Sequence, residues 1–320
     1  MELDSLEYAL IEALRRNAAR SDRELASDLG ENMTDVEAAR ERLEERGVIE
    51  SYSAVIDPPA VGLDTLSYHL VGATDNYDET LADGLPTYNA WGGTQLVMVV
   101  LGQYDLIIRK VSEDSDAFSR FARNIIENTN TPGFTRRETY RVDERYRWNG
   151  QNISEDKQYG VSDPVDTTEI QRNVLNTLVR DGRLRRRHDQ LAERVGEPVS
   201  DVTAAVETLE QRDVITGYTA NVSFDTLGWY RAFLGLSAVQ GGYKSSIDRL
   251  LQFDPFRVPY IVSGTGFNWL DIGVELVFES IEMLDDLTDE IRTECDARES
   301  QTLLSTKVFQ DDRNVPFDDG

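Results

Sequence analysis

The strongest constraint on this chain of 320 residues is an internal repeat with a constant spacing. Leu25-Ala26 recurs 166 positions later as Leu191-Ala192, and Val48-Ile49 recurs as Val214-Ile215. The same spacing relates Tyr52 to Tyr218, Gly62 to Gly228, Asp105 to Asp271, and Val142 to Val308. Upstream, Leu10 and Leu14 match Val174 and Leu178 at a spacing of 164, so the second copy is expected to hold two extra residues in an early loop. A spacing kept over such a length predicts a tandem duplication.

A polar stretch separates the two copies. Residues 148–166 contain Gly and Pro and show no apolar periodicity, so they are predicted to be a linker. The polar residues 311–320 are predicted to be a loose tail. Together with a change of pattern inside each copy, these segments divide the chain at the following predicted boundaries: 1–62, 63–147, 148–166, 167–228, 229–310 and 311–320.

Each copy is predicted to begin with three short helices and a strand. In copy one, Leu6, Leu10 and Leu14 fall on one helical face. Ser21 with Glu24, and Thr34 with Glu37, have the spacing of capping boxes at the starts of two further helices. A short alternating strand over 48–56 follows and ends before Pro58. This order predicts a winged helix–turn–helix over 1–62, and the matching pattern predicts a second one over 167–228, in which Ser200 caps the third helix.

The rest of each copy alternates between strand and helix patterns. In copy one, strands are expected over 66–73, 96–101, 106–111 and 134–142, with helices over 77–85 and around Phe118 to Ile126. Copy two repeats this order from Phe233 to Phe309. The pattern predicts an α+β chain in which two winged helix–turn–helix domains alternate with two ferredoxin-like βαββαβ domains, 63–147 and 229–310.

The charge of the chain is strongly negative. Its formal net charge is −26, and it contains four Lys but 29 Arg. Such a charge is typical of a protein that avoids nucleic acid. The scarcity of Lys instead resembles proteins of extreme halophiles, whose surface acids work in molar salt, where charges are screened within about 3 Å. We favour the second interpretation, in which net charge does not exclude DNA binding.

Other features narrow the class of protein. No run of about 18 apolar residues is present, so no transmembrane helix is expected. The acidic N-terminus does not resemble a signal peptide, and the single Cys295 cannot form an internal disulfide. A cytoplasmic protein is therefore expected. His69 and His188 make no metal or catalytic pattern with Cys295, so neither a cofactor nor an enzymatic activity is expected.

These motifs resemble the Lrp/AsnC family of transcription regulators, whose RAM domains have the βαββαβ order. The resemblance rests on the following residues: Leu25, Ala26, Leu43, Gly47, Val48, Ile49, Tyr52, Asp57, Pro58, Gly62, Gly102, Tyr104 and Asp105. It implies a sequence-specific DNA-binding regulator that forms homo-oligomers through its βαββαβ domains. Because two such domains are tethered here, the two copies are expected to pair within one chain or to swap between two chains, and to present two unequal helix–turn–helix heads. It also implies an amino acid or a similar small effector near the Gly-x-Tyr-Asp turn.

The third helix of each head would enter the major groove of double-stranded DNA. In copy one, Thr34, Ala38 and Arg42 are the candidates to read bases, and Arg23 is a candidate phosphate contact. In copy two, the basic segment with Arg185, Arg186 and Arg187 is expected to bind phosphates, and Ser200 and Thr208 lie on the helix without Arg. The alternatives are arginines that pair with nearby acids on solvated helices, and a solvated basic loop.

The candidate effector residues are Gly102, Tyr104, Asp105, Asn268 and Asp271. Gly102 permits a close approach of the backbone, and Asp105 would receive an ammonium group. In copy two, Asn268 and Leu270 replace Gly102 and Tyr104, so one site is expected to be lost or altered. The alternative is that Gly-x-Tyr-Asp is only a tight hairpin turn.

Two other functions compete with the regulator. A sirohaem-decarboxylase-like enzyme would share a fold with paired halves, and Phe267-Asn268-Trp269 is weakly similar to it. The pocket strands are expected to lack the His and clustered Arg that tetrapyrrole carboxylates require. A protein that assembles with other family members without binding DNA is the third possibility, and the basic segment argues against it.

Overall fold

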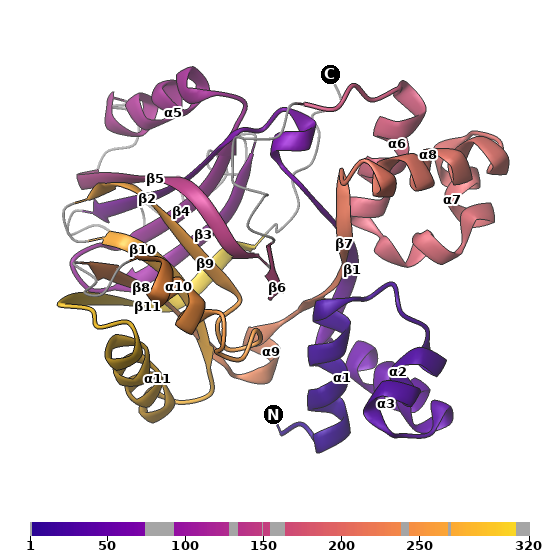
Figure 1. Cartoon of the computed structure of the whole chain (residues 1–320), viewed down its shortest axis with the longest axis horizontal. Helices are drawn as coiled ribbons and strands as arrows, with labels where there is room; N and C mark the ends of the chain where they lie inside the picture. The colour runs from indigo at the N-terminus through magenta and orange to yellow at the C-terminus, as the bar shows by residue number, and fades with distance from the viewer. Residues whose placement is uncertain are drawn as a thin grey trace. The chain divides into compact units, whose positions relative to one another are not determined.

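The computed structural model describes residues 2–73, 93–127, 134–148, 150–153, 164–237, 243–267 and 270–311. The chain forms two compact units, and each combines segments from both sequence halves (Figure 1). The first unit contains Met1–Val61 and Pro164–Trp229, and the second contains Gly62–Asp163 and Tyr230–Val315. The six-part division remains a prediction, but its boundaries at 62/63 and 228/229 lie within one residue of the change of unit.

The first unit holds two sets of three helices. The first set and its strand are α1 (Ser5–Arg16), α2 (Asp22–Leu29), α3 (Met33–Glu45), β1 (Ile49–Ile56) and the 3-10 turn η1 (Pro59–Val61). The second set comprises α6 (Glu169–Arg180), η2 (Gly182–Arg186), α7 (His188–Val195), α8 (Val199–Gln211), β7 (Ile215–Val222) and α9 (Phe224–Leu227). Buried apolar side chains such as Leu10, Val36 and Leu43 explain the helical periodicity of the first set.

Helix starts agree with the sequence in part. The capping box of Ser21 and Glu24 forms, since each accepts a hydrogen bond from the backbone N–H of the other. The box predicted for Thr34 is wrong, because Asn32 in extended conformation precedes a helix that already begins at Met33. The predicted cap at Ser200 is also wrong, since α8 begins at Val199 after Pro198.

The two strands of this unit pair with each other. β1 and β7 run antiparallel, and Ser53 lies opposite Thr219, the residue 166 positions later. Each expected wing is therefore a single strand whose partner comes from the other half of the chain. The first helix of each half also crosses over, because α1 contacts β7 and α6 contacts β1. The backbone N–H of Ala18 donates to the carbonyl of Tyr218 at 2.8 Å, which fixes this crossing.

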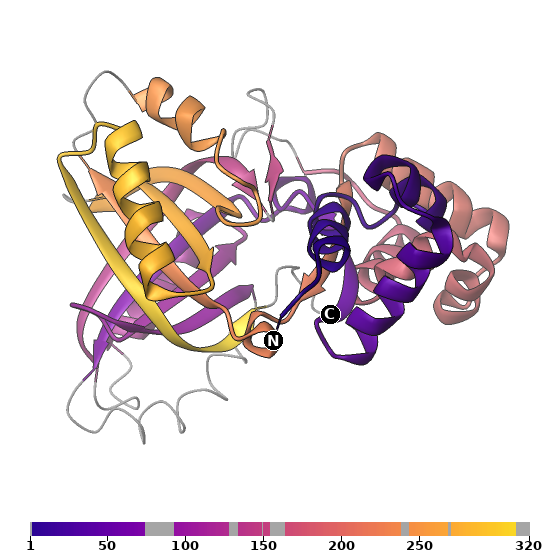
Figure 2. The same cartoon turned by 90° about the horizontal axis from the view of Figure 1, so that it is seen from below.

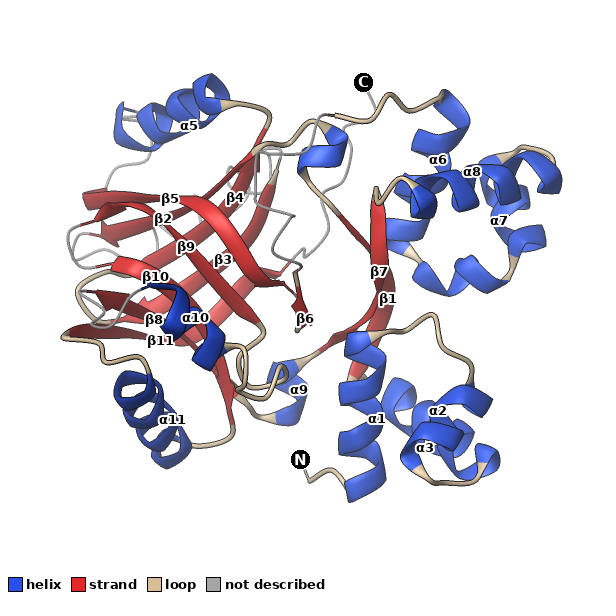
Figure 3. Ribbon diagram, viewed as in Figure 1, coloured by secondary structure: helices blue, strands red, loops and turns tan. Residues whose placement is uncertain are grey.

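The second unit is built on one closed barrel (Figure 3). Its first-half elements are β2 (Thr65–Ala73), β3 (Thr94–Leu101), β4 (Leu106–Ser112), α5 (Ser115–Glu127), β5 (Phe134–Trp148) and β6 (Gln151–Asn152). Its second-half elements are β8 (Tyr230–Ser237), α10 (Tyr243–Leu250), β9 (Tyr260–Phe267), β10 (Leu270–Phe278), α11 (Ile281–Glu294) and β11 (Glu299–Asp311). The strand order is β2-β4-β3-β11-β8-β10-β9-β5, and pairing of β2 with β5 closes the ring.

This closure confirms that the two copies pair within one chain, and it corrects the prediction that they form two separate βαββαβ domains. Four strands from each half join through the antiparallel pairs β3–β11 and β5–β9, so the halves form a single eight-stranded barrel within one chain. Pairing satisfies the backbone groups that two open sheets would leave at their edges. The expected linker is also partly structured, since Trp148 is buried at the end of β5 and Gln151–Asn152 form β6. The expected helix at 77–85 lies outside the described residues.

The outer face of the barrel wall packs apolar side chains against helices, whereas the inner face combines charged, aromatic and apolar side chains. Ile272, Val274 and Leu276 of β10 pack in one core cluster with side chains of α10 and α11. Figure 2 shows α11, in yellow, along the outside of the barrel. Because alternate residues of a strand point to opposite faces, Glu275 of β10 points inward. The rings of Phe233 and Tyr68 lie on the same inner side at a centroid distance of 5.2 Å and are tilted by 40° to each other.

Candidate nucleic-acid interface

One face of α3 carries the three residues expected to read bases. Thr34, Ala38 and Arg42 follow one another at intervals of four and therefore share this face. Thr34 and Arg42 are exposed and Ala38 is half-buried, because Val36, Ala39 and Leu43 hold the opposite face in the core. The exposed acids Asp35, Glu37 and Glu41 stand on the same helix.

Arg42 is held by acids of the first helix segment. Its Nε donates to Oε1 of Glu7 at 3.2 Å, and a terminal nitrogen lies 3.4 Å from Oδ2 of Asp4. Glu7 is buried and also accepts two hydrogen bonds of 2.9 Å from Arg46. The Arg42 side chain nevertheless keeps 47% of its surface exposed. A DNA phosphate or base would therefore compete with two carboxylates for this guanidinium.

The corresponding face of α8 carries no positive charge. Ser200 and Thr208 occupy the places of Thr34 and Arg42. Ser200 is exposed and its hydroxyl donates to Asp201, whereas the Thr208 hydroxyl donates to the carbonyl of Ala204 at 2.7 Å. Both side chains thus hydrogen-bond within their own helix.

Most of the basic segment makes internal contacts. Arg185 holds both carboxylate oxygens of Glu210, one at 2.8 Å, and the Tyr218 hydroxyl donates to the same carboxylate at 2.9 Å. This pairing raises the pKa of Arg185. Arg186 donates to the carbonyl of Ala19 and lies 3.3 Å from Glu24. These two arginines join segments of the first unit. The density of positive charge in the sequence does not reveal these internal contacts.

The two exposed arginines at the starts of α2 and α7 have no acidic partner among the residues that the structure describes. Arg23 lies in the first turn of α2, and Arg187 is the N-cap of α7. Arg187 makes only a long contact of 3.5 Å to the Gln190 amide in the described part of the chain. Both therefore stand at the start of the second helix of a set. The N-terminal end of a helix also attracts anions through its backbone N–H groups.

Two exposed apolar residues were missed by the sequence reasoning. Met33 and Val199 begin α3 and α8, lie 166 positions apart, and expose 46% and 48% of their surface. Large apolar side chains are usually buried, so their exposure is unusual. The signal in the sequence is that an apolar residue recurs at this position in both copies.

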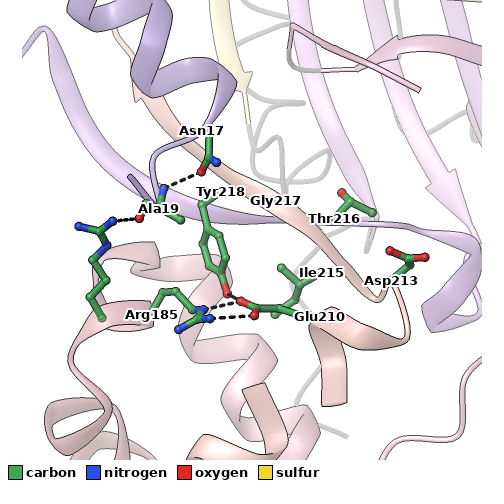
Figure 4. Close-up of a pocket in the computed structure, with 10 residues that line it drawn as sticks. Asn17, Ala19, Arg185, Glu210, Asp213, Ile215, Thr216, Gly217 and Tyr218 are labelled. Atoms are coloured by element: carbon green, nitrogen blue, oxygen red, sulfur yellow. Dashed lines mark hydrogen bonds and ion pairs between the residues drawn. The ribbon is translucent and has the colours of Figure 1, made fainter. Parts of the chain in front are cut away.

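A pocket of about 540 Å³ opens beside the Arg185–Glu210 pair (Figure 4). Its lining residues are Asn17, Ala19, Arg185, Arg186, Glu210, Asp213, Ile215, Thr216, Gly217 and Tyr218. Figure 4 shows Arg185 and Tyr218 directed at the Glu210 carboxylate. The lining has two cationic and two anionic side chains, so this pocket does not favour one sign of ligand charge.

Gly102, Tyr104 and Asp105 lie in the turn between β3 and β4, and Asp271 lies at the start of β10. Gly102 has a positive φ of 147°, and a side chain there would come within 2.8 Å of Leu303. Tyr104 is fully buried. The backbone N–H of Asp105 donates to Val71 and its carbonyl accepts from Val100, which makes a tight turn. Asp271 is exposed and its carbonyl accepts from the Tyr140 hydroxyl at 3.0 Å, while Asn268 lies outside the described residues. No ligand role is tested by these contacts.

The barrel strands hold more basic side chains than expected. Arg109 is fully buried and lies 2.5 Å from Glu275, and Arg147 donates to the backbone carbonyls of Leu251, Phe253 and Val258. The expectation that strands at a tetrapyrrole pocket lack His and clustered Arg stays a prediction, because Arg109 is paired with Glu275. His69 is also buried, between the hydroxyls of Ser67 and Thr139. Desolvation, with a smaller effect of Lys110, lowers the pKa of His69 to about 3.

No protein-family model matches the chain. Its sequence is 28% identical over 150 residues to the HTH-type transcriptional regulator LrpA of Mycobacterium tuberculosis, covering 46% of this chain and 96% of LrpA. It is 26% identical over 121 residues to the leucine-responsive regulatory protein of Rhizobium meliloti, covering 38% of this chain and 78% of that protein. The chain has homologues among Lrp/AsnC-type transcriptional regulators. Each of these regulators aligns with less than half of the chain.

The whole fold resembles that of an enzyme. The siroheme decarboxylase NirDL superposes with a TM-score of 0.64 over 96% of this chain and 92% of its own, at 14% identity. A second structure of NirDL, with an iron-uroporphyrin III analogue, superposes equally well. The expectation that the chain has no enzymatic activity is contradicted by this match, because an enzyme shares the fold over nearly the full length. At this identity the likeness concerns the fold.

The described residues contain no group of His, Cys, Asp and Glu side chains that is able to hold a metal ion. Within the same part of the chain, none of the helices has the length and apolar character needed to cross a membrane.

Proposed function

We propose that the chain is a DNA-binding transcriptional regulator with two unequal helix–turn–helix heads. The observation that carries the proposal is the exposed face of α3, with Thr34, Ala38 and Arg42 beside the exposed Arg23. The similarity to Lrp-type regulators supports the same function. In this proposal α3 enters the major groove. Arg42 leaves the carboxylates of Asp4 and Glu7 and donates to the edge of a guanine base.

The second head binds the DNA backbone and reads few bases. Arg187 at the start of α7 meets a phosphate, as does Arg23 at the start of α2. Met33 and Val199, exposed where α3 and α8 begin, suit the methyl group of thymine. Arg185 and Arg186 keep their contacts to Glu210 and Ala19 and shape the head that presents Arg187.

The decisive experiment is selection of genomic fragments by the full chain in high salt, followed by polarisation measurements on a selected fragment. Arg42→Ala should weaken binding to that fragment by about 1–3 kcal/mol and relax its base preference. Thr208→Ala is the matched variant of the other head and should leave binding nearly unchanged. A wild-type chain that selects no fragment above random DNA would overturn the proposal.

Phosphate contact has a different signature. Arg23→Ala and Arg187→Ala should weaken binding to selected and random DNA alike, and each should reduce the salt slope by about 0.9 log units per log salt. Arg172, exposed on α6 with a hydrogen bond to a backbone carbonyl, is the control. If Arg172→Ala has the same effect, the slope reflects overall charge and not contact at the second helices.

A small effector and assembly into oligomers also belong to the proposal. Gly102, Tyr104, Asp105 and Asp271 remain the candidate effector residues, and an amino acid is the ligand class. Calorimetry with the common amino acids, repeated on Asp105→Ala, tests them. Absence of any binding would favour the alternative of a tight turn. Because the described barrel strands pair within one chain, oligomers would use other surfaces.

A second candidate function is tetrapyrrole decarboxylation, which is favoured by the superposition on siroheme decarboxylase over 96% of the chain. The buried arginines of the barrel strands, Arg109 and Arg147, show that these strands accommodate positive charge. An absorbance titration with sirohaem tests this function. A saturable spectral change followed by loss of carboxylate groups from the product would support it, and a spectrum unchanged by the protein would exclude it.

A further inference from the structure

A buried ion pair joins two residues that occupy matching places in the repeat. Arg109 of β4 and Glu275 of β10 are 166 positions apart, and a guanidinium nitrogen of Arg109 lies 2.5 Å from Oε1 of Glu275. The side chains expose 0% and 8% of their surface. The Tyr68 hydroxyl donates to the same oxygen of Glu275 at 2.9 Å. Matching positions thus carry opposite charges, out of contact with solvent.

The two residues meet across the interior of the barrel. Four strand-to-strand steps separate β4 from β10 in either direction around the ring, so these strands lie opposite each other. Exchanging the two halves of the repeat maps β2 onto β8, β4 onto β10, β3 onto β9 and β5 onto β11, and it leaves the strand order unchanged. Arg109 and Glu275 are therefore related by the approximate two-fold symmetry of the barrel.

This placement restricts which halves can pair. A barrel built from two copies of the first half would set Arg109 against Arg109, and one from two second halves would set Glu275 against Glu275. Either arrangement buries two like charges at hydrogen-bonding distance, which is strongly unfavourable. We propose that Arg109 and Glu275 form a charge key, which permits each half of the barrel to pair with the unlike half and prevents self-pairing between chains.

The residues around the ion pair also favour the pairing of unlike halves. The Arg109 guanidinium lies 4.3 Å from the ring centre of Tyr260 and 5.0 Å from that of Trp148, where a cation is favoured. Leu96 of β3 lies opposite Arg109 as Tyr260 of β9 lies opposite Glu275. Phe233 of β8 lies opposite Glu275 as Tyr68 of β2 lies opposite Arg109. The aromatic ring of Tyr260 that contacts the Arg109 cation is therefore not repeated in the first half. The Tyr68 hydroxyl that donates to the Glu275 carboxylate is not repeated in the second half.

Stability alone does not account for such a pair. A buried ion pair is often no more stabilising than apolar residues of similar volume, whereas it can select one pairing over another. The inference does not depend on the proposed function, because it concerns how the halves of the barrel recognise each other.

Charge variants of the full chain test the contact first. Arg109→Glu and Glu275→Arg should each lower the midpoint of thermal unfolding by about 10 °C or more, because each buries like charges. The double variant R109E/E275R should recover part of this loss. Exchange of the exposed pair Arg292 and Asp289, which are 3.5 Å apart on α11, is the control and should change little. A double variant no more stable than the worse single variant would contradict the key.

A neutral variant tests selectivity separately from stability. R109M/E275Q should fold with a midpoint near that of the wild type. When equal amounts of isotope-labelled and unlabelled chains are unfolded and refolded together, it should give dimers with cross-links between like halves of two chains. Wild-type chains should give none of these links. Neutral chains that refold without like-half links, as the wild type does, would overturn the proposal even if the charge variants behave as expected.

Discussion

The two helical sets of the first unit share their order of elements but differ in how their charges are placed. In the first set, Arg42 and Arg46 of α3 contact Glu7 of α1. In the second, α8 carries no Arg, and the arginines stand in η2, where Arg185 holds Glu210. The repeat therefore preserves the fold and relocates the positive charge. This difference is the reason to expect two heads with unequal tasks on DNA.

One detail shows how the sets diverge. Tyr52 and Tyr218 occupy matching places, and their hydroxyls donate to the matching carboxylates of Glu44 and Glu210. Both carboxylates are also bound by an arginine of η2: Arg183 reaches Glu44 of the first set at 3.4 Å, and Arg185 binds Glu210 of its own set through two contacts. The loop of the second copy thus stabilises both sets, and the first set offers no counterpart.

The largest effect should come from removing Glu210. Glu210→Ala leaves the buried Tyr218 hydroxyl and the half-buried Arg185 without their acceptor, so the free energy of unfolding should fall by about 2–3 kcal/mol. Glu44→Ala should cost about 1 kcal/mol, because its arginine is more exposed and contacts it at one longer distance. Denaturant titrations in high salt measure both losses.

The control for this comparison is Glu207→Ala, an exposed acid on the same helix as Glu210. Its loss should stay within about 0.5 kcal/mol. Glu210→Gln should recover part of the loss, since its amide oxygen still accepts a hydrogen bond from Tyr218. Equal losses for Glu44→Ala and Glu210→Ala would show that the two sets are stabilised alike, against the asymmetry described above.

The sequence predicted local structure better than it predicted partners. Apolar periodicity located most of the helices and strands that the structure describes, because burial of one face is a local pattern, but it missed the short elements α9 and β6. It did not indicate that β3 pairs with β11 or that the ring closes, since pairing between distant segments leaves no period in the sequence. The repeat together with the family resemblance did predict that the two halves pair, but it did not show that they join edge to edge in one barrel.

The candidate site was limited in the same way. The spacing of Thr34, Ala38 and Arg42 predicted a shared face, but it did not show that Asp4 and Glu7 hold Arg42. The basic segment was interpreted as a phosphate contact, whereas Arg185 and Arg186 bind groups of their own unit. Density of charge along a chain does not identify the acids that folding brings near it, so paired and unpaired arginines look alike in sequence.

The barrel halves differ at another matching pair, His69 and Leu234, and pH should expose this difference. The folded pKa of His69, about 3, lies below its unfolded value of about 6.5. The unfolded chain therefore binds a proton first as pH falls. The free energy of unfolding is therefore not reduced by His69 above about pH 6.5. Below that pH it falls by about 1.4 kcal/mol per pH unit, or by about 2 kcal/mol at pH 5.

His69→Gln should remove this part of the pH dependence and leave the remainder. The measurement is the free energy of unfolding at pH 7, 6 and 5, compared between the wild type and the variant. Glutamine retains a donor and an acceptor for the hydroxyls of Ser67 and Thr139. Parallel pH curves for the two proteins would mean that another group, and not the buried ring on β2, causes the loss in acid.

The smallest effect concerns the turn after the third helix of each set. Gly47 has φ 67° and its counterpart Asp213 has φ 55°, a region that strains any residue with a side chain. The two turns are otherwise alike, since the N–H of each donates to the carbonyl of Glu44 or Glu210 at 3.0 or 3.1 Å. Asp213→Gly should therefore stabilise the chain by about 0.5–1 kcal/mol, and Gly47→Asp should destabilise it by a similar amount.

No atom lies within 4 Å of a Cβ added at Gly47, so the loss of stability in Gly47→Asp would be conformational and not steric. If denaturant titrations show that Asp213→Gly destabilises the chain, the aspartate side chain stabilises the second turn by more than its backbone strain costs, and the two turns are not equivalent.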